Sequence, residues 1–357
     1  MSRPFVSVLI DTYNHERFIE EAISSVLAQD FPASDREILV VDDGSTDRTP
    51  EILSKFATQV RMLRKVNGGQ ASAFNFGIPR CRGEIVAFLD GDDWWAPGKL
   101  ATVVNAMTAD SSLGIVGHGI VSVFLDGREQ AETLRENFRF QADTVEGAHL
   151  LRRRSAFLGT SRMTIRSELL RNIGPVPEAI EIQADEYLFT LAAVLAPVEI
   201  LPALLTFYRI HEANRFQLSV YDPERIRRKQ ESLTVLARTL LERMESFGIQ
   251  PLVGREVVAY TQACADQMRL QLDGGWPWET VATEWKLYRI LHPDAAVARR
   301  VFKSFLLAAA LFVGPKFFYG AQRRLSQSDL YRRTRARWLP APEMKHLKKD
   351  WLQRRGA

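Results

Sequence analysis

Residues 84–95 read EIVAFLDGDDWW, a short apolar run that ends in three aspartates and two tryptophans. The run Glu84–Leu89 favours β-structure and is too short for a helix, so it predicts a buried strand. A strand buried on both faces cannot accommodate Asp90, Asp92 and Asp93, so we expect these carboxylates beyond its carboxyl end. Closely spaced oxygen ligands suit a divalent cation that keeps positions open for phosphate oxygens. For this stretch alone, an acidic loop that only ends a strand is an equal alternative.

The preceding sequence alternates between strand and helix patterns. Short apolar runs at Val6–Ile10, Glu37–Val41 and Arg61–Leu63 are separated by segments whose apolar residues recur at helical spacing. Asn14 and Thr49 are expected to cap the first two helices. This alternation predicts an α/β fold, a three-layer α/β/α sandwich with a mostly parallel central sheet.

Polar residues follow the end of each expected strand. Because the carboxyl ends of parallel strands meet at one edge of a sheet, these residues should line a single crevice. An aromatic ring, several carboxylates and a Gly-rich turn in one crevice suit a nucleotide phosphate held through a metal ion. The residues are Asp11, Thr12, Tyr13 and Asn14 after the first strand, Asp42 and Asp43 after the second, Asn67 to Gly69 after the third, and Asp90 to Asp93 after the fourth.

The length of 357 residues indicates two or three packed units. We expect residues 1–110 and 111–222 to form two halves of the α/β domain, and residues 223–357 to form a C-terminal helical region. Cys81 and Cys264 are the only cysteines, which points to a reducing compartment, and the N-terminus lacks the pattern of a secretory signal. We therefore expect a cytoplasmic protein.

The charge is unevenly distributed. Residues 299–357 contain fifteen Lys and Arg against three acids, which gives +12 in a chain whose net charge is +4. Within this region, Phe302–Ala321 combines an apolar run with aromatic residues and is followed by clustered arginines. These features predict a segment that lies on an anionic membrane surface, at the inner face of the cell membrane; a buried helix with a solvated basic tail is the alternative. No nucleic-acid-binding motif accompanies the charge, so we expect no nucleic-acid partner.

Four stretches of the first hundred residues together resemble the nucleotide-sugar half of family 2 glycosyltransferases with the GT-A fold. They are VSVLIDTYNHERFIEEAISSVLAQ, EILVVDDGSTDRTPEIL, NGGQASAFNFG and GEIVAFLDGDDWWAPGKL. The resemblance implies that Asp11 and Tyr13 border the nucleotide base, with Tyr13 stacked on it, and that Asp43 bonds to the base or ribose. Asn67 and Gly69 belong to the same donor-binding set.

The resemblance further implies that Asp90 and Asp92 form the D-x-D element. Asp90 would lie at the ribose, and Asp92 would bind Mg²⁺ or Mn²⁺ at the diphosphate. In the third motif, Phe74 stands where the family more often has Arg. Trp94 and Trp95 either pack in the core or, for one of them, floor the sugar or acceptor pocket, and His118 is expected to be a core residue.

The stretch QADEYLF at 183–189 is expected to open an amphipathic helix. In the resemblance it corresponds to the family's Glu-Asp pair, which places Ala184 at the Glu position and Asp185 at the catalytic base; Glu186 is the base if the register slips by one. Downstream, YRIHEAN at 208–214 resembles the family's Tyr-Arg-x-His ending, so Arg209 and His211 could reach the diphosphate. For His211 a structural role is an equal alternative.

The resemblance therefore implies an inverting, metal-dependent glycosyltransferase of the hexosyltransferase class. It would use a nucleoside-diphosphate sugar as donor and a lipid-linked or surface-polysaccharide hydroxyl as acceptor. A sugar-phosphate nucleotidyltransferase, which would not need Asp185, is one rival. A non-catalytic sugar-nucleotide-binding or membrane scaffold protein is the other, and Ala184 in place of Glu favours it.

Overall fold

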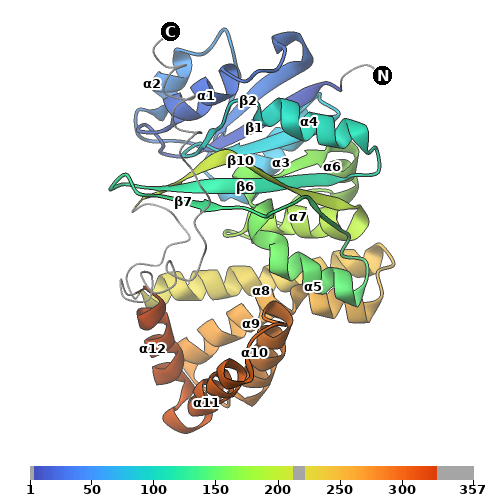
Figure 1. Cartoon of the computed structure of the whole chain (residues 1–357). Helices are drawn as coiled ribbons and strands as arrows, with labels where there is room; N and C mark the ends of the chain where they lie inside the picture. Colours follow the sequence, from blue (N-terminus) through green and yellow to red (C-terminus); the bar gives the residue numbers. More distant parts are fainter. Residues whose placement is uncertain (1–3, 212–221, 328–357) are drawn as a thin grey trace.

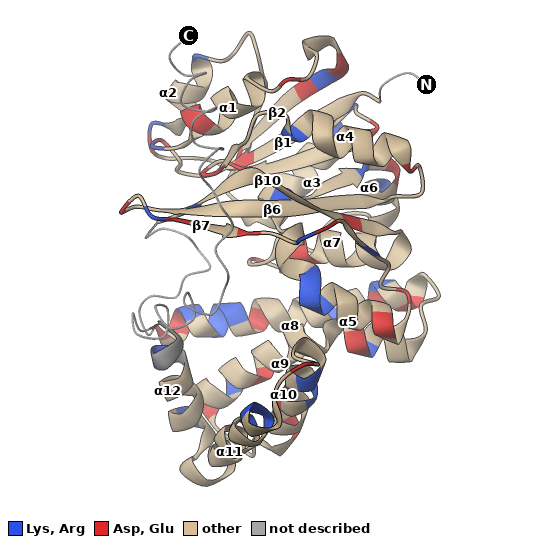
Figure 2. Ribbon diagram, in the orientation of Figure 1, with Lys and Arg blue, Asp and Glu red and all other residues tan. Residues whose placement is uncertain are grey.

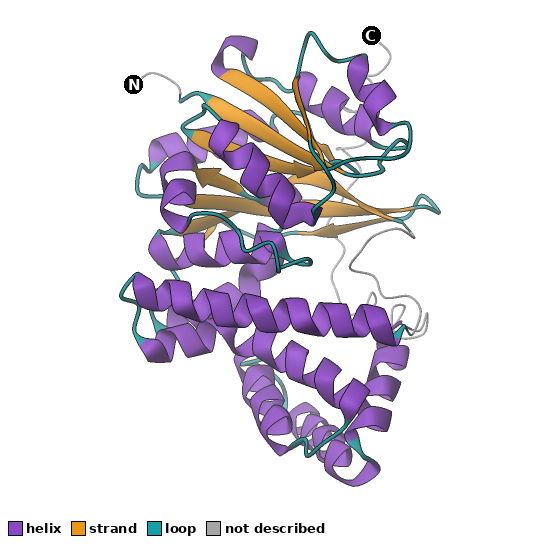
Figure 3. Cartoon of the chain, turned by 180° about the vertical axis from the view of Figure 1, so that it is seen from behind, coloured by secondary structure: helices purple, strands orange, loops and turns teal. Residues whose placement is uncertain are grey.

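The computed structural model describes residues 4–211 and 222–327 (Figure 1). An α/β domain with one large sheet stands above a group of C-terminal helices, and the helical group lies at one end of the molecule (Figures 1 and 3). The arginine-rich stretch from residue 328 onward, part of the predicted membrane-binding region, lies outside the described residues.

The central sheet has the strand order β3-β2-β1-β4-β9-β6-β10-β5, with β7 paired to β6 and β8 paired to β10. Strands β1, β2, β3 and β4 are parallel, as are β6 and β10, whereas β9 runs antiparallel between β4 and β6. The sheet is therefore mixed but mostly parallel, as the sequence predicts. The strands are β1 (Val6–Thr12), β2 (Arg36–Asp42), β3 (Arg61–Arg64), β4 (Ile85–Asp90), β5 (Trp94–Trp95), β6 (Ile115–Phe124), β7 (Glu129–Glu132), β8 (Phe138–Phe140), β9 (Thr164–Arg166) and β10 (Val198–Ile210).

Both faces of the sheet are covered because its central strands are apolar on both sides. In β1, Leu9 packs into one core, while Val8 and Ile10 pack into the other. The first core takes α3 (Gly69–Gly77), α5 (Val145–Arg154), α6 (Ser167–Ile173) and α7 (Ala184–Leu195). The second takes α1 (Ile19–Leu27), α2 (Thr49–Ser54) and α4 (Lys99–Ala109). This arrangement confirms the three-layer α/β/α sandwich.

Three local predictions for the α/β domain are wrong. The polar, unpatterned sequence of residues 129–143 predicts a loop, but these residues contain β7 and β8, short strands that pair with β6 and β10. Asn14 does not cap α1, which begins at Ile19, and Thr49 does not cap α2 but is its first residue. Asn14 instead has φ +55°, and its Oδ1 accepts a hydrogen bond from the backbone N–H of Thr46 at 2.8 Å, which joins the loops after β1 and β2.

The described part of the C-terminal region, residues 223–327, is helical, as predicted. It comprises α8 (Pro223–Ser246), α9 (Pro251–Asp273), α10 (Trp278–Leu291), α11 (Val297–Val313) and α12 (Pro315–Gln327). Leu233 and Leu236 of α8 pack into the same core as α7, so the helical region is continuous with one face of the α/β domain. Within the described ranges, no helix is both long enough and apolar enough to cross a membrane.

The α/β domain also contains short 3₁₀ turns. They are η1 (Ala33–Asp35), η2 (Ile78–Arg80), η3 (Ser155–Leu158) and η4 (Thr160–Arg162).

Candidate active site

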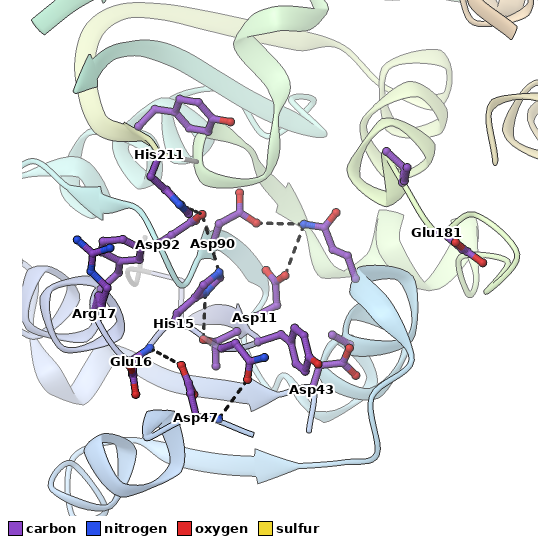
Figure 4. Close-up of a pocket in the computed structure, with 18 of the residues that line it drawn as sticks. Asp11, His15, Glu16, Arg17, Asp43, Asp47, Asp90, Asp92, Glu181 and His211 are labelled. Atoms are coloured by element: carbon purple, nitrogen blue, oxygen red, sulfur yellow. Dashed lines mark hydrogen bonds and ion pairs between the residues drawn. The ribbon is translucent and has the colours of Figure 1, made fainter. Parts of the chain in front are cut away.

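Two acids lie side by side at the carboxyl edge of the sheet. The parallel register of β1 and β4 places Asp11 directly opposite Asp90, and Asp92 follows in the loop after β4 (Figure 4). Gly91 is required here, since a Cβ at this position would lie 2.7 Å from Oγ1 of Thr12 and 2.8 Å from Nδ1 of His15. The D-G-D sequence thus lets the loop after β4 pass close to the end of β1.

A pocket of about 650 Å³ opens at this edge. It brings together six of the nine residues predicted for the site: Asp11, Tyr13, Asp43, Asp90, Asp92 and His211. Asn67, Gly69 and Asp185 do not line it. The full lining is Asp11, Thr12, Tyr13, Asn14, His15, Glu16, Arg17, Phe18, Asp43, Asp47, Gln70, Ala73, Asp90, Asp92, Leu125, Glu181, Ile182, Tyr208 and His211.

The clustered carboxylates have perturbed acidities. Burial and the charge of Asp92 raise the pKa of Asp11 to about 7. Burial and the charge of Asp11 raise the pKa of Asp90 well above its usual value. In addition, Oδ1 of Asp11 is buried without a hydrogen-bond partner among the described residues. In the described part of the chain, no positive charge therefore balances these carboxylates at the edge of the sheet. A bound cation would stabilise their ionised forms.

Asp92 is held in the ionised form by its neighbours. Its Oδ2 lies 3.0 Å from Nε2 of His211 and 3.9 Å from Nε2 of His15. Burial alone would raise the pKa of Asp92, but the His211 hydrogen bond and the nearby charge of His15 lower it below the usual value. Figure 4 shows both imidazoles directed at this carboxylate. Asp92 is thus the member of the cluster best prepared to bind a cation.

Gln70 connects the acids and was missed by the sequence analysis. Its Nε2 donates to Oδ1 of Asp90 at 3.0 Å, lies 3.5 Å from Oδ2 of Asp11, and reaches Oγ1 of Thr160 at 3.2 Å. Ser161, next to Thr160 in η4, donates through Oγ to Oδ2 of Asp90 at 3.3 Å. The amide of Gln70 thus lies between two carboxylates. The only signal for it in the sequence is its position at the end of the NGGQ motif.

Asp43 organises the loop before α3. Its carboxylate accepts hydrogen bonds from the backbone N–H groups of Gly68 at 3.0 Å and Gly69 at 2.7 Å, and from Nζ of Lys65 at 2.7 Å. Asn67 donates through Nδ2 to the Asp43 backbone carbonyl at 2.9 Å. An acid at a helix N-terminus is favourable because it satisfies free N–H groups. Asn67 and Gly69 therefore hold Asp43, which in turn fixes the start of α3 and the position of Gln70.

Asp185 lies in the first turn of α7, close enough to the acid cluster for its charge to affect Asp11 and Asp90. Its Oδ2 accepts from the backbone N–H of Thr160 at 3.2 Å, and Thr160 also contacts Gln70. Burial raises the pKa of Asp185, and its charge in turn raises those of Asp11 and Asp90. Gln183, two residues before Asp185 and directly before α7, is a non-glycine residue with φ +67°, a backbone conformation that is costly and concentrated at functional sites.

Glu186, the competing base, points into a different environment. Its Oε1 accepts a hydrogen bond from Oγ1 of Thr261 in α9 at 2.6 Å, and its Oε2 accepts one from Nε2 of Gln183. Burial raises its pKa. Glu186 therefore joins α7 to the C-terminal helices, whereas Asp185 accepts a hydrogen bond from Thr160, the residue that contacts Gln70.

Arg209 and His211 have different roles. Arg209 donates to the backbone carbonyl of Asp92 at 2.9 Å and to Oε2 of Glu21 at 2.7 Å, and it does not line the pocket. His211 does line the pocket. Arg209 therefore supports the loop that contains Asp92, while His211 contacts its carboxylate.

The tryptophans and His118 are core residues. Trp95 is fully buried beneath Lys99, whose Nζ lies 3.8 Å from the ring centroid. Trp94 stacks on Phe207 with centroids 5.1 Å apart. His118 is fully buried, with Nδ1 2.9 Å from the carbonyl oxygen of Gly119. None of the three lines the pocket, and all three are buried, as expected for core residues.

The residues fit a divalent cation that is only partly held by protein. Among residues 4–211 and 222–327, no group of three or more His, Cys, Asp and Glu side chains is arranged to hold a metal ion alone. The oxygen-rich edge around Asp92, with the unpartnered Oδ1 of Asp11, nevertheless matches the ligand preference of Mg²⁺ and Mn²⁺. Such an ion needs further ligands from a substrate.

Comparison with known proteins places this geometry in context. The family model described as glycosyl transferase family 2 matches residues 7–174. The uncharacterized glycosyltransferase alr2836 of Nostoc sp. is 33% identical over 216 residues, which are 58% of this chain and 66% of that protein. The uncharacterized glycosyltransferase EpsJ of Bacillus subtilis is 38% identical over 128 residues, which are 35% of this chain and 36% of that protein. The chain thus spans less than two thirds of the length of either relative.

The fold also has solved counterparts. The crystal structure of Staphylococcus aureus TarS 1–349 in complex with UDP-GlcNAc superposes with a TM-score of 0.53 and 21% sequence identity. The superposition covers 86% of this chain and 91% of that one. At this level of identity the likeness establishes the shared fold, which is the GT-A fold expected from the sequence motifs.

Proposed function

The chain belongs to glycosyl transferase family 2, and we propose that it transfers a sugar from a nucleoside-diphosphate sugar to an acceptor hydroxyl group. The single observation that supports this most strongly is the pocket itself. It joins an aromatic residue, Tyr13, to the carboxylates of Asp11, Asp90 and Asp92 at the carboxyl edge of the sheet. An aromatic surface for a base, beside oxygen ligands for a diphosphate-bound cation, matches the base and the diphosphate of a sugar nucleotide.

The donor is proposed to lie along the carboxyl edges of β2, β1 and β4. Tyr13 would stack on the nucleotide base, with Asp11 beside it, and Asp90 would face the ribose. Asp43 lines the pocket, but its carboxylate already accepts bonds from Gly68, Gly69 and Lys65. We therefore assign Asp43 to shaping the donor loop together with Asn67 and Gly69, with at most one further bond to the nucleotide.

Asp92 is the residue that would hold Mg²⁺ or Mn²⁺, since it is the acid whose pKa is lowered by its neighbours. When bound, the ion would offset negative charge on the diphosphate leaving group. His211 and His15 keep Asp92 ionised, and Arg209 fixes its backbone. Each of these contacts prepares the site before substrate arrives, which is how electrostatic catalysis avoids reorganisation during the reaction.

We propose Asp185 as the general base. It would accept the proton of the acceptor hydroxyl as that oxygen attacks the anomeric carbon from the face opposite the leaving group. A raised pKa brings Asp185 nearer to a working pH at which a carboxylate can exchange protons, and burial is the cause of the shift. A single displacement with one base inverts the anomeric centre.

The alternatives receive less support. A nucleotidyltransferase would not need Asp185. In this structure, however, Asp185 is connected to Gln70 and the acid cluster through the hydrogen bonds of Thr160. A scaffold protein would not need an acid held beside the pocket with a raised pKa. The family match, with relatives named as glycosyltransferases, also favours sugar transfer.

We further propose that the acceptor is a lipid-linked or surface-polysaccharide glycan and that the protein works at the cytoplasmic face of the cell membrane. The strongly basic C-terminal region supports this placement, because anionic lipids attract clustered Lys and Arg.

The transfer reaction can be tested with radiolabelled sugar nucleotides and a bacterial lipid extract as the source of acceptors. Incorporation of label into the lipid fraction from one donor, with dependence on Mn²⁺ or Mg²⁺, is the expected result. An Asp185→Asn protein that retains donor binding but not incorporation would confirm that turnover depends on the proposed base. Transfer of a nucleoside monophosphate in place of the sugar would overturn the assignment.

A further inference from the structure

The outer face of α11 is apolar and exposed along most of its length. Phe305 and Phe312 are 73% and 87% exposed, although helices of soluble domains usually present charged residues to water. The opposite face, with Leu307 and Ala310, is buried in a small core shared with α9, α10 and α12. We call the exposed set the α11 patch: Val301, Phe302, Phe305, Leu306, Phe312 and Val313.

Aromatic residues from two neighbouring elements extend the α11 patch at its C-terminal end. Phe317 in the first turn of α12 is 69% exposed and follows Val313 after only three residues. The loop between α9 and α10 contains the exposed Trp276 and lies against α12, since a Cβ on Gly274 would be 3.0 Å from Cε of Lys316. Tryptophan and phenylalanine beside an apolar helix face are typical of residues at a lipid–water interface.

The segment that carries the α11 patch contains charged residues of one sign only. Residues 295–327 contain six Lys and Arg and no Asp or Glu (Figure 2): Arg299, Arg300, Lys303, Lys316, Arg323 and Arg324. Lys316 and Arg324 are exposed. An apolar helix face within a segment that contains cations and no acid complements a surface that offers both hydrocarbon and negative charge, which is an anionic lipid bilayer.

We infer that the α11 patch is a membrane-docking surface, on which α11 lies in the plane of an anionic bilayer with Phe305 and Phe312 inserted among the lipids. The helix is anchored to α9, α10 and α12 by its buried face, so it presents one side only, as an interfacial helix does. This inference specifies the surface through which the proposed membrane partner is bound. It does not depend on the transfer reaction, so the two proposals can fail separately.

Charge argues against the two other occupants of this face. A second copy of the chain would bring two segments of like charge together, each with six cations and no acid. The chain's own residues 328–357 contain nine Lys and Arg against three acids and would meet the same repulsion. Lipid headgroups of negative charge are attracted by both segments.

The test is co-sedimentation of the full chain with vesicles, comparing the wild type with a Phe305→Ser/Phe312→Ser variant. We expect the wild type to sediment with vesicles of phosphatidylcholine and phosphatidylglycerol but not with phosphatidylcholine alone. The double variant should bind the mixed vesicles at least tenfold more weakly. A Lys316→Gln/Arg324→Gln variant should lose part of the binding and its dependence on salt.

The matched control replaces two exposed apolar residues outside the α11 patch, Val66→Ser and Leu252→Ser, which are 87% and 53% exposed. It should bind as the wild type does, and unchanged melting temperatures would show that all variants fold. Vesicle binding that survives in the Phe305→Ser/Phe312→Ser protein overturns the inference and assigns the contact to residues 328–357. A dimer that the same variant converts to a monomer, without vesicle binding by either protein, overturns it in favour of a second copy.

Discussion

His211 Nε2 lies 3.0 Å from Oδ2 of Asp92 and so connects the end of β10 to the loop after β4, 119 residues earlier in the chain. Removal of this contact should weaken metal-dependent donor binding by about 10- to 100-fold, the usual range for residues that support a metal ligand. The reason is that Asp92 would lose the hydrogen bond that lowers its pKa.

This prediction can be checked by calorimetric titration of a His211→Ala protein with sugar nucleotide and Mn²⁺. His211→Gln, which can still donate a hydrogen bond, is the control and should recover part of the affinity. Wild-type affinity in the alanine variant would show that His211 has only a structural role.

Replacement of Asp185 by Asn should leave donor affinity unchanged and lower the transfer rate by about 10²- to 10⁴-fold, as loss of a general base does. Glu186→Gln is the natural control, because its carboxylate is bound to Thr261 of α9 and not to the site. It should keep most of the activity. If Glu186→Gln is inactive and Asp185→Asn is active, the general base is Glu186 and not Asp185.

Gln70→Leu removes the amide that lies between Asp11 and Asp90. Two buried acids then lose a shared donor, and we expect the free energy of unfolding to fall by about 1–3 kcal/mol, the cost of an unsatisfied buried polar group. Urea unfolding of the ligand-free protein measures this change in the free energy of unfolding. Gln70→Glu, which adds a charge to the cluster, should be less stable than Gln70→Leu at pH 8; the opposite order would contradict the electrostatic account.

The stability of the ligand-free protein should fall between about pH 4 and pH 7. The pKa of Asp11 rises from 3.8 to about 7 on folding, so in this range the folded protein binds a proton that the unfolded chain releases. Stability from this group is complete below pH 4 and is lost as the pH rises through 7, with a slope of at most about 1.4 kcal/mol per pH unit. Asp90, whose pKa is also raised, acts in the same direction.

The predicted fall in stability with rising pH can be checked by measuring the free energy of unfolding across this range without metal ion, for the wild type and for Asp11→Asn. Asp11→Asn should flatten the pH dependence, and addition of Mn²⁺ with donor should do the same for the wild type. A slope that is equal in both proteins would place the titrating group elsewhere.

The sequence predicted the parts of the site that depend on strand ends. Because β1 and β4 are parallel and in register, Asp11 and Asp90 had to meet once both strands were recognised. Gln70 could not be found in this way, because its position depends on how Asp43 holds the start of α3. Thr160, which contacts Gln70, lies in a 3₁₀ turn 90 residues further along the chain, and this contact has no local signature.

The errors in the secondary structure have a similar origin. The strands β7 and β8 are three or four residues long and partly exposed, so they show no run of buried residues that the sequence could reveal. Asn14 was expected to be a helix cap because of its residue type. Its left-handed backbone instead lets it bridge to Thr46, a contact between two loops that propensity does not describe.

The most direct test of the proposed function is a thermal-shift panel of UDP-, GDP-, CMP- and dTDP-sugars, each with and without Mn²⁺, on the wild type and on Asp92→Asn. A ligand that binds only the folded protein raises the melting temperature by mass action. We predict a shift for one class of sugar nucleotide that requires Mn²⁺ and is absent in Asp92→Asn. No shift with any of them in the folded wild type, or an equal Mn²⁺-dependent shift in Asp92→Asn, would contradict the donor site described here.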